Sequence, residues 1–336
     1  MSCNSRYCSG IQLTVTGRFS HCNNKRGCPK TLVFGQLFYV DYPITDKQIL
    51  YFNVSDHSEQ QVDFFTQDEV NLHTHCKYCR HAVGDVSDYV DKARKDGIRL
   101  LGMSDHCPVP DDRWHSARMF YSEIDDYQRD CENAIRNAGD MHIFRGFETD
   151  YHKDYVSYYR DEVLGERGFD YLLLAVHNYY APDGSDIMIP DCPINDKAVL
   201  HTYTKTLIEG MQSGLFLYAV HPDLFAASYL EWDEEAKACS RDILACAEAV
   251  HMPIEINGQG IRAKKVVSSS GERYRYPIQE FWNLAAEYDV SVVTAADCHK
   301  PEDMLSSRKA CKEIAAKANL TFARYAIDEN RKIVIR

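Results

Sequence analysis

The chain has 336 residues, of which 45% are hydrophobic and 26% are charged, as is usual for globular proteins. No apolar run approaches the roughly 18–20 residues of a membrane span, and the polar N-terminus lacks the apolar core of a secretory signal. The net charge of −12 argues against a general nucleic-acid binder, which normally presents a basic face. Thirteen cysteines scattered through apolar segments favour free thiols, so we expect a cytoplasmic protein.

Residues 1–67 differ in character from the rest of the chain. Cys3, Cys8, Cys22 and Cys28 lie among polar and basic residues, and β-type runs follow them. Their spacings, Cys-x4-Cys and Cys-x5-Cys, are looser than the Cys-x2-Cys of common zinc knuckles, which favours unliganded thiols over a structural zinc site. We expect a small β-rich N-terminal extension over 1–67.

Over residues 68–336, strand-like and helix-like segments alternate. The predicted strands are 69–72, 98–103, 141–147, 171–176, 215–220, 253–256 and 290–295. The predicted helices are 86–95, 122–138, 155–164, 196–212, 233–250, 278–287 and 302–318. Repeated strand–helix units form a parallel sheet, and about seven of them within roughly 260 residues favour a closed barrel. We therefore expect an α/β fold with one TIM-like barrel domain.

Potential metal ligands follow six of the seven predicted strands. His73 and His75 come after the first strand, and side chains two positions apart on a strand point to the same face. The sixth strand, which ends Glu255-Ile256-Asn257, offers no usual ligand set. Because a parallel barrel gathers the carboxyl ends of its strands at one face, we expect one cluster there. Its predicted members are His73, His75, His81, His106, Glu148, His177, His221, Asp297 and His299.

Nine nitrogen and oxygen ligands are too many for one ion, so two or three divalent ions are expected. Zn²⁺, Mn²⁺ and Fe²⁺ all suit such a ligand set. Seven neutral imidazoles and two carboxylates carry a charge of −2, which would leave an excess of positive charge around three divalent ions. A cavity of that charge favours a phosphate dianion, whose phosphorus a metal-held hydroxide would attack in line.

The ligand positions resemble, in order, the motifs of the PHP (polymerase and histidinol phosphatase) family. The resemblance covers about residues 68–300 and rests on His73-x-His75, His81, Ser104-Asp105-His106, Glu148, His177, His221-Pro222 and Asp297-x-His299. It implies a distorted (βα)7 barrel with a trinuclear site. By position, it implies one ion held by His73, His75, Glu148 and Asp297. It also implies a second ion on Glu148, His177 and His221, with Glu148 bridging, and a third on His81, His106 and His299.

Within the family, the histidinol-phosphate phosphatases are the most similar branch. That likeness is carried by His75-x3-Cys79-x-His81, Arg145-Gly146-Phe147-Glu148, the stretch from Glu255 to Arg262, and Tyr274-x-Tyr276-Pro277. It implies hydrolysis of L-histidinol phosphate to L-histidinol and phosphate, a step of histidine biosynthesis. Three features of this chain depart from the family: Ala82 stands where the family commonly has glycine, the N-terminal residues are added, and the loop at Val267–Gly271 is long. These departures leave the exact substrate open.

The sequence is also compatible with two other functions. Other PHP branches resemble phosphodiesterases or exonucleases that act on nucleotides or oligonucleotides, although the acidic charge makes nucleic acid an unfavourable partner. A non-catalytic, metal-binding regulatory module is the third hypothesis. For a phosphomonoesterase we expect catalytic roles for Glu148 and Asp297, and phosphate contacts from Arg262 and Arg118. Cysteines beside the ligands are expected to pack rather than to ligate: Cys76, Cys79, Cys107 and Cys298.

Overall fold

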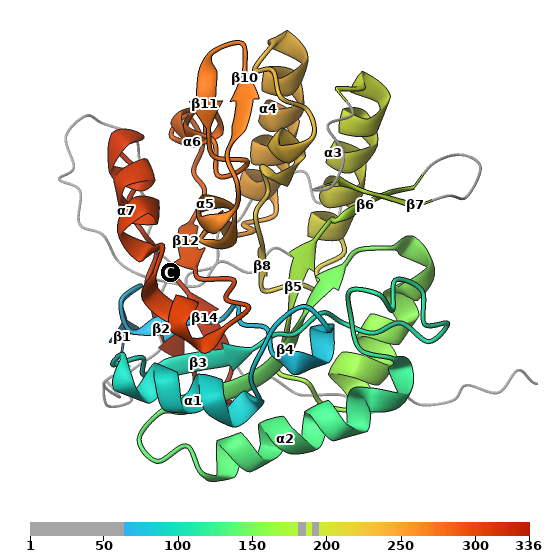
Figure 1. Cartoon of the computed structure of the whole chain (residues 1–336), viewed down its shortest axis with the longest axis vertical. Helices are drawn as coiled ribbons and strands as arrows, with labels where there is room; N and C mark the ends of the chain where they lie inside the picture. The colour runs from blue at the N-terminus through green and yellow to red at the C-terminus, as the bar shows by residue number, and fades with distance from the viewer. Residues whose placement is uncertain (1–63, 181–185, 190–194) are drawn as a thin grey trace, which may run out of the picture. The chain divides into compact units, whose positions relative to one another are not determined.

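The computed structural model describes residues 64–180, 186–189 and 195–336 (Figure 1). The predicted extension over 1–67 therefore lies almost wholly outside the described residues, together with its four cysteines, and it stays a prediction. The first described strand, β1 (Phe64–Phe65), pairs with a strand from the C-terminal part of the chain.

The central sheet holds seven parallel strands, one for each predicted strand. Their order is β12-β9-β8-β5-β4-β3-β2. Their bounds are β2 (Val70–Asn71), β3 (Leu100–Met103), β4 (His142–Asp150), β5 (Tyr171–Ala175), β8 (Tyr218–Ala219), β9 (Ile254–Asn257) and β12 (Val292–Ala295). A parallel bridge between Thr74 and Cys298, with a 3.0 Å hydrogen bond from the His75 N–H to the Cys298 carbonyl, joins the two outermost strands. The predicted distorted (βα)7 barrel is confirmed.

Helices connect successive strands and surround the sheet (Figure 1). The longer ones are α1 (Val86–Lys95), α2 (Ile124–Arg136), η4 (Tyr158–Glu166, π-helical), α3 (Lys197–Gln212), α4 (Glu234–Ala249), α6 (Gln279–Ala285) and α7 (Arg308–Lys317). Shorter turns are η1 (Lys77–Cys79), η2 (Tyr121–Glu123), η3 (Lys153–Tyr155), η6 (Leu224–Ala227), α5 (Gln259–Arg262) and η7 (Pro301–Leu305). The segment predicted as one helix over 302–318 is thus divided into η7 and α7.

Local sequence explains where several helices begin and end. Asp196 accepts a hydrogen bond from the Ala198 N–H at 2.7 Å, and Asp233 accepts one from the Ala236 N–H at 2.9 Å. These carboxylates satisfy N–H groups that have no partner within the first turn. Gly97 and Gly139, with φ of +76° and +68°, follow the ends of α1 and α2, where the left-handed conformation favours glycine.

The strands are buried on both faces, because one face lines the barrel interior and the other meets the helices. Adjacent residues alternate between two apolar clusters: Leu172 joins the helix side, whereas Leu173 joins the interior cluster. An antiparallel sheet of β1, β13 (Tyr325–Ile327) and β14 (Ile333–Ile335) contributes Phe65 and Tyr325 to the interior cluster. The interior is therefore a packed core below the carboxyl ends of the strands.

Two hairpins extend the loops that follow the strands. Strands β6 (Asn178–Tyr180) and β7 (Asp186–Met188) follow β5, and β10 (Val266–Ser268) and β11 (Gly271–Arg273) follow α5. The long loop expected at Val267–Gly271 is the turn region of this second hairpin. Among the described residues, none of the helices combines the length and the hydropathy needed to cross a membrane.

Candidate metal centre

The nine predicted ligand residues meet at the carboxyl ends of the parallel strands, around Glu148 of β4. Glu148 is buried and its two oxygens face different histidines. Oε2 lies 3.4 Å from His73 Nε2 and 3.2 Å from His75 Nε2. Oε1 lies 2.8 Å from His221 Nε2 and 3.4 Å from His177 Nε2. Both oxygens of this carboxylate are therefore placed to help hold divalent cations.

Asp297 lies on the other side of the first histidine pair. Its Oδ1 is 3.1 Å from His75 Nε2 and 3.6 Å from His73 Nε2. The amide of Asn257 donates a 3.0 Å hydrogen bond to its Oδ2, which orients the carboxylate. Asp297 and His221 have φ of +49° and +31°, a conformation that residues other than glycine rarely adopt. Backbone strain of this kind is concentrated at functional sites.

A second group of histidines lies nearer the surface. Ligand atoms of His81, His106 and His299 all lie within 4.8 Å of one another. The Nε2 atoms of His81 and His299 are 2.9 Å apart, and the Nδ1 atoms of these two rings face backbone carbonyls at 2.8 and 3.2 Å. His106 Nδ1 also lies 3.1 Å from Glu148 Oε2, so it connects this group to the central carboxylate.

Carboxylates outside the predicted set lie beside the outward-facing nitrogens of three ligand histidines and share hydrogen bonds with two of them. Glu255 Oε1 lies 3.0 Å from His73 Nδ1, and Asp150 Oδ2 lies 3.1 Å from His177 Nδ1. Asp105 Oδ1 lies farther away, 3.5 Å from His75 Nδ1. Such contacts set the tautomer of the ring and direct the opposite nitrogen toward the cluster.

Sequence reasoning missed Glu255 and Asp150, although a signal for both was present. An acidic residue within a strand that is otherwise apolar must find a buried partner. Glu255 lies in the strand for which no ligand was predicted, and Asp150 lies two residues after Glu148, on the same side of the strand.

Buried charges shift the pKa values within the cluster in opposite directions. Burial opposes ionisation of Glu148, but the imidazoles of His177, His73 and His106 outweigh it and hold the Glu148 pKa well below its usual range. Burial disfavours a charge on His73 too, yet Asp297 and Glu255 raise its pKa to about 10. Burial lowers the pKa of His299 to about 3. The carboxylates are therefore ionised and strongly attract positive charge.

Divalent metal ions fit this cluster. Several buried ligand atoms have no hydrogen-bond partner although they face one another: His73 Nε2, His75 Nε2, His106 Nδ1 and Asp297 Oδ1. Buried polar atoms without partners are unfavourable, and a cation placed among them would satisfy all of them. Imidazole nitrogens combined with carboxylate oxygens suit Zn²⁺, Mn²⁺ or Fe²⁺.

A family model described as PHP domain matches residues 71–259, which is more than half of the chain and includes most of the cluster. The chain belongs to the PHP domain family. A protein from Deinococcus radiodurans named "probable histidinol-phosphatase" is 28% identical over 239 residues, which cover 69% of this chain and 86% of that protein. A "probable phosphatase" from Shewanella amazonensis is 25% identical over 240 residues, covering 70% of this chain and 78% of that protein.

Solved structures with this fold include a histidinol phosphate phosphatase from Lactococcus lactis, complexed with zinc, L-histidinol and phosphate. It matches with a TM-score of 0.59 at 15% identity, over 80% of this chain and 99% of that one. At this identity the similarity shows the fold alone, and it agrees with the barrel described above.

The two arginines predicted to contact phosphate have other partners in this PHP site. Arg262 donates to the carbonyls of Ala296 and Asp297 at 2.8 Å and to the Ser307 hydroxyl at 2.9 Å, so it holds the end of β12 in place. Arg118 is buried and donates to Asp150 Oδ2 at 2.8 Å and to the Cys107 carbonyl at 3.0 Å. Arg118 thus reaches His177 through Asp150, and the phosphate contacts of both arginines stay predictions.

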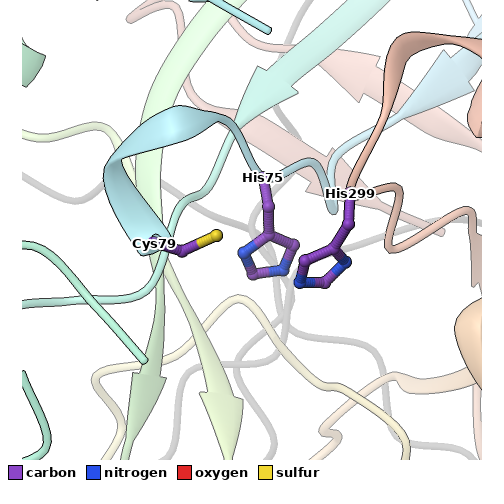
Figure 2. Close-up of side chains that lie close together, drawn as sticks. All are labelled: His75, Cys79 and His299. Atoms are coloured by element: carbon purple, nitrogen blue, oxygen red, sulfur yellow. The ribbon is translucent and has the colours of Figure 1, made fainter. Parts of the chain in front are cut away.

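Cysteines line the PHP cluster as buried free thiols, and all eight described cysteines are free. Ligand atoms of His75, Cys79 and His299 lie within 4.8 Å of one another, and Figure 2 shows the thiol directed toward His75. Burial, together with the charge of Asp105, raises the pKa of Cys79 to about 11. The thiol accepts a 3.3 Å hydrogen bond from the Ala82 N–H. A protonated, hydrogen-bonded thiol agrees with the packing role expected for Cys79.

Proposed function

We propose that this PHP protein is a metal-dependent phosphomonoesterase of small phosphorylated metabolites, with L-histidinol phosphate as the favoured substrate. The observation that carries the proposal is the orientation of Glu148, whose two oxygens face separate histidine pairs at 2.8–3.4 Å. Divalent ions held by Glu148 and these histidines would suit phosphoryl transfer, in which charge develops on both the attacking and the leaving oxygen.

Bound divalent ions would supply a lowered pKa for the attacking water and positive charge for the phosphoryl oxygens. The chain itself holds the ligands in place before substrate arrives. Glu255 and Asp150 fix the rings of His73 and His177, and Asn257 fixes the carboxylate of Asp297. Such preorganisation avoids moving charged groups during the reaction.

Burial within the cluster indicates the side from which substrate approaches. His73 and His75 are fully buried, whereas the side chains of His177 and His299 are each 16% exposed. His81 is also exposed. A phosphate group would therefore meet the cluster from the side of these three histidines, with its organic part toward solvent and the surrounding loops.

The substrate class is favoured by charge and by similarity. A net charge of −12 disfavours long nucleic acids, whose phosphates repel an acidic surface. Curated proteins similar to this chain carry the names "probable histidinol-phosphatase" and "probable phosphatase". The Lactococcus lactis protein with the same fold binds zinc, L-histidinol and phosphate.

The proposal is tested by assaying purified protein, loaded with Mn²⁺ or Zn²⁺, for phosphate release from L-histidinol phosphate and from a panel of sugar and nucleotide monoesters. We expect turnover of L-histidinol phosphate and of no short oligonucleotide. Preferred turnover of another monoester would overturn the substrate but keep the class. Cleavage of oligonucleotides alone would favour the phosphodiesterase, and full metal loading without any turnover would favour the regulatory module.

A matched variant shows whether the measured phosphate release comes from this protein or from a contaminating phosphatase. Glu148→Gln keeps the size of the side chain but removes the charge that two cations would share. We expect it to lose at least about 100-fold in activity, the upper range for loss of a residue that merely supports a metal ligand. Activity equal to that of the wild type would show that the measured phosphate release does not come from this cluster.

A further inference from the structure

The segment Tyr274-Arg275-Tyr276-Pro277 brings an aromatic residue against the metal cluster. The ring of Tyr276 packs edge-on against the imidazole of His221, with ring centroids 5.7 Å apart and an interplanar angle of 65°. Tyr276 is 8% exposed, and its hydroxyl makes no hydrogen bond to any other residue in the described part of the chain. The hydroxyl is not one of the buried polar atoms that lack a partner, so it is open to solvent and available to a ligand.

The turn that follows β9 lets the chain pack closely against Tyr276. Asn257 Oδ1 accepts the Gln259 N–H at 2.7 Å and thereby begins the short helix α5. A Cβ atom at Gly260 would lie 2.1 Å from the Tyr276 carbonyl oxygen and 2.5 Å from its ring, distances that real side chains do not reach. Only glycine lets α5 approach the ring this closely. The turn after β9 therefore places the tyrosine beside His221.

Arg275, next to Tyr276, is a cation without an anionic partner. It is half-buried, its Nε is shielded from solvent without a hydrogen-bond partner, and its side chain makes no hydrogen bond or ion pair within the described residues. Arg273, by contrast, uses its guanidinium on the carbonyls of Ala226 and Leu230. In an acidic protein, a shielded guanidinium left unpaired favours an anionic ligand.

We propose that Tyr276 donates a hydrogen bond to a phosphoryl oxygen of the bound phosphate monoester and that Arg275 supplies positive charge to the same group. The inference rests on the proposed function and deepens it. It adds a phosphate contact from this segment to the one predicted for Arg262, whose guanidinium also donates to backbone carbonyls.

The test uses the full metal-loaded protein with inorganic phosphate as the probe. Tyr276→Phe removes only the hydroxyl and keeps the ring against His221. A hydrogen bond to a charged group typically changes a binding constant by about 10-fold or more, so calorimetric titration should show a phosphate Kd raised at least about 10-fold. Arg275→Gln should raise it similarly. Metal content, measured by elemental analysis, should not change in either variant.

The control is Tyr229→Phe, which removes a hydroxyl that donates to Asp233 Oδ2 at 2.7 Å, at the start of α4. It should bind phosphate as the wild type does. Unchanged phosphate affinity in Tyr276→Phe, or a loss of metal from that variant, would overturn the contact. If the wild-type protein hydrolyses no monoester but binds phosphate in a Tyr276-dependent manner, the proposed function fails while the contact stands.

Discussion

At the scale of single residues, the orientation of each imidazole depends on the partner of its outward nitrogen. His73 Nδ1 faces Glu255, His177 Nδ1 faces Asp150, and His81 Nδ1 faces the Cys79 carbonyl at 2.8 Å. These partners direct the opposite Nε2 atoms toward the cluster and keep them unprotonated when a cation binds. Glu255 and Asp150, which were not predicted as ligands, therefore control the orientation of the ligand histidines and with it their affinity for metal.

Glu255→Gln tests whether the partner of an outward nitrogen controls metal binding, at the buried ligand His73. The amide keeps the volume and one acceptor oxygen but loses the charge that holds His73 Nδ1–H. Loss of such a supporting group typically weakens metal affinity by about 10- to 100-fold, which a competition titration against a chelator measures. The surface variant Glu231→Gln, whose carboxylate accepts hydrogen bonds from Ser269, should bind metal normally. Equal affinity in both variants would contradict the role of Glu255.

At the scale of elements, the loops after the strands carry the site, and buried contacts hold them to the barrel. Asp223, two residues after His221, accepts the Ile278 N–H at 2.8 Å and the Trp282 indole N–H at 3.1 Å. It thereby ties the loop after β8 to the start of α6. Gly260 has a similar role in α5, because the absence of a side chain there lets α5 pack directly against Tyr276.

Asp223 predicts a pH dependence of stability. Burial raises its pKa to about 7 from 3.8, so the folded protein binds a proton more tightly than the unfolded chain does. Its contribution is complete below about pH 4 and falls by about 1.4 kcal/mol per pH unit as pH rises toward 7. In metal-free protein, Asp223→Asn should remove this slope, as measured by urea unfolding at pH 5, 6 and 7. Parallel slopes for variant and wild type would refute the assignment.

Gly260→Ala tests the packing of α5 on Tyr276. The added methyl group meets the backbone and ring of Tyr276, and overpacking of this kind costs about 1–3 kcal/mol. We expect a lower free energy of unfolding, together with weaker phosphate binding. Gly165→Ala is the control, because it lies on an exposed helical position and its Cβ would meet only the Arg160 carbonyl, at 3.2 Å. Similar free energies of unfolding for the two variants would contradict this account of Gly260.

At the scale of the whole molecule, ligands from six of the seven parallel strands or the loops that follow them meet in one cluster. In the metal-free protein this cluster gathers ionised carboxylates and unpartnered polar atoms between the strand ends. A cation bound there would link segments as distant as His73 and Asp297, and any ligand that binds only the folded state stabilises it. Metal should therefore act on the entire barrel rather than on one loop.

Removal of metal by a chelator should lower the melting temperature, and Zn²⁺ or Mn²⁺ should restore it. At a free metal concentration about 100 times the Kd, binding at one site adds about 2.7 kcal/mol to the free energy of unfolding. Differential scanning calorimetry measures the shift, and Glu148→Gln should show a smaller one. A melting temperature that does not respond to metal in the wild type would show that the cluster binds no ion in the folded state.

Much of this architecture could be predicted because it is encoded locally. Strands such as Tyr171–Ala175 are short apolar runs, helices such as Val86–Lys95 begin at an acidic residue, and both signals need only neighbouring residues. The placement of histidines directly after strands is equally local. Parallel barrel topology then brings strand ends to one face, so the nine candidate ligands could be named from the sequence.

The sequence alone therefore determined the order of strands and helices and the residues that gather at one end of the barrel. Tertiary structure decided which atoms meet: which oxygen of Glu148 faces which histidine, that Glu255 supports His73, and that Arg262 binds backbone while Arg275 has no side-chain partner among the described residues. Those contacts join residues far apart in the chain, such as His73 and Glu255, and depend on sheet register and side-chain packing. No local pattern carries that information.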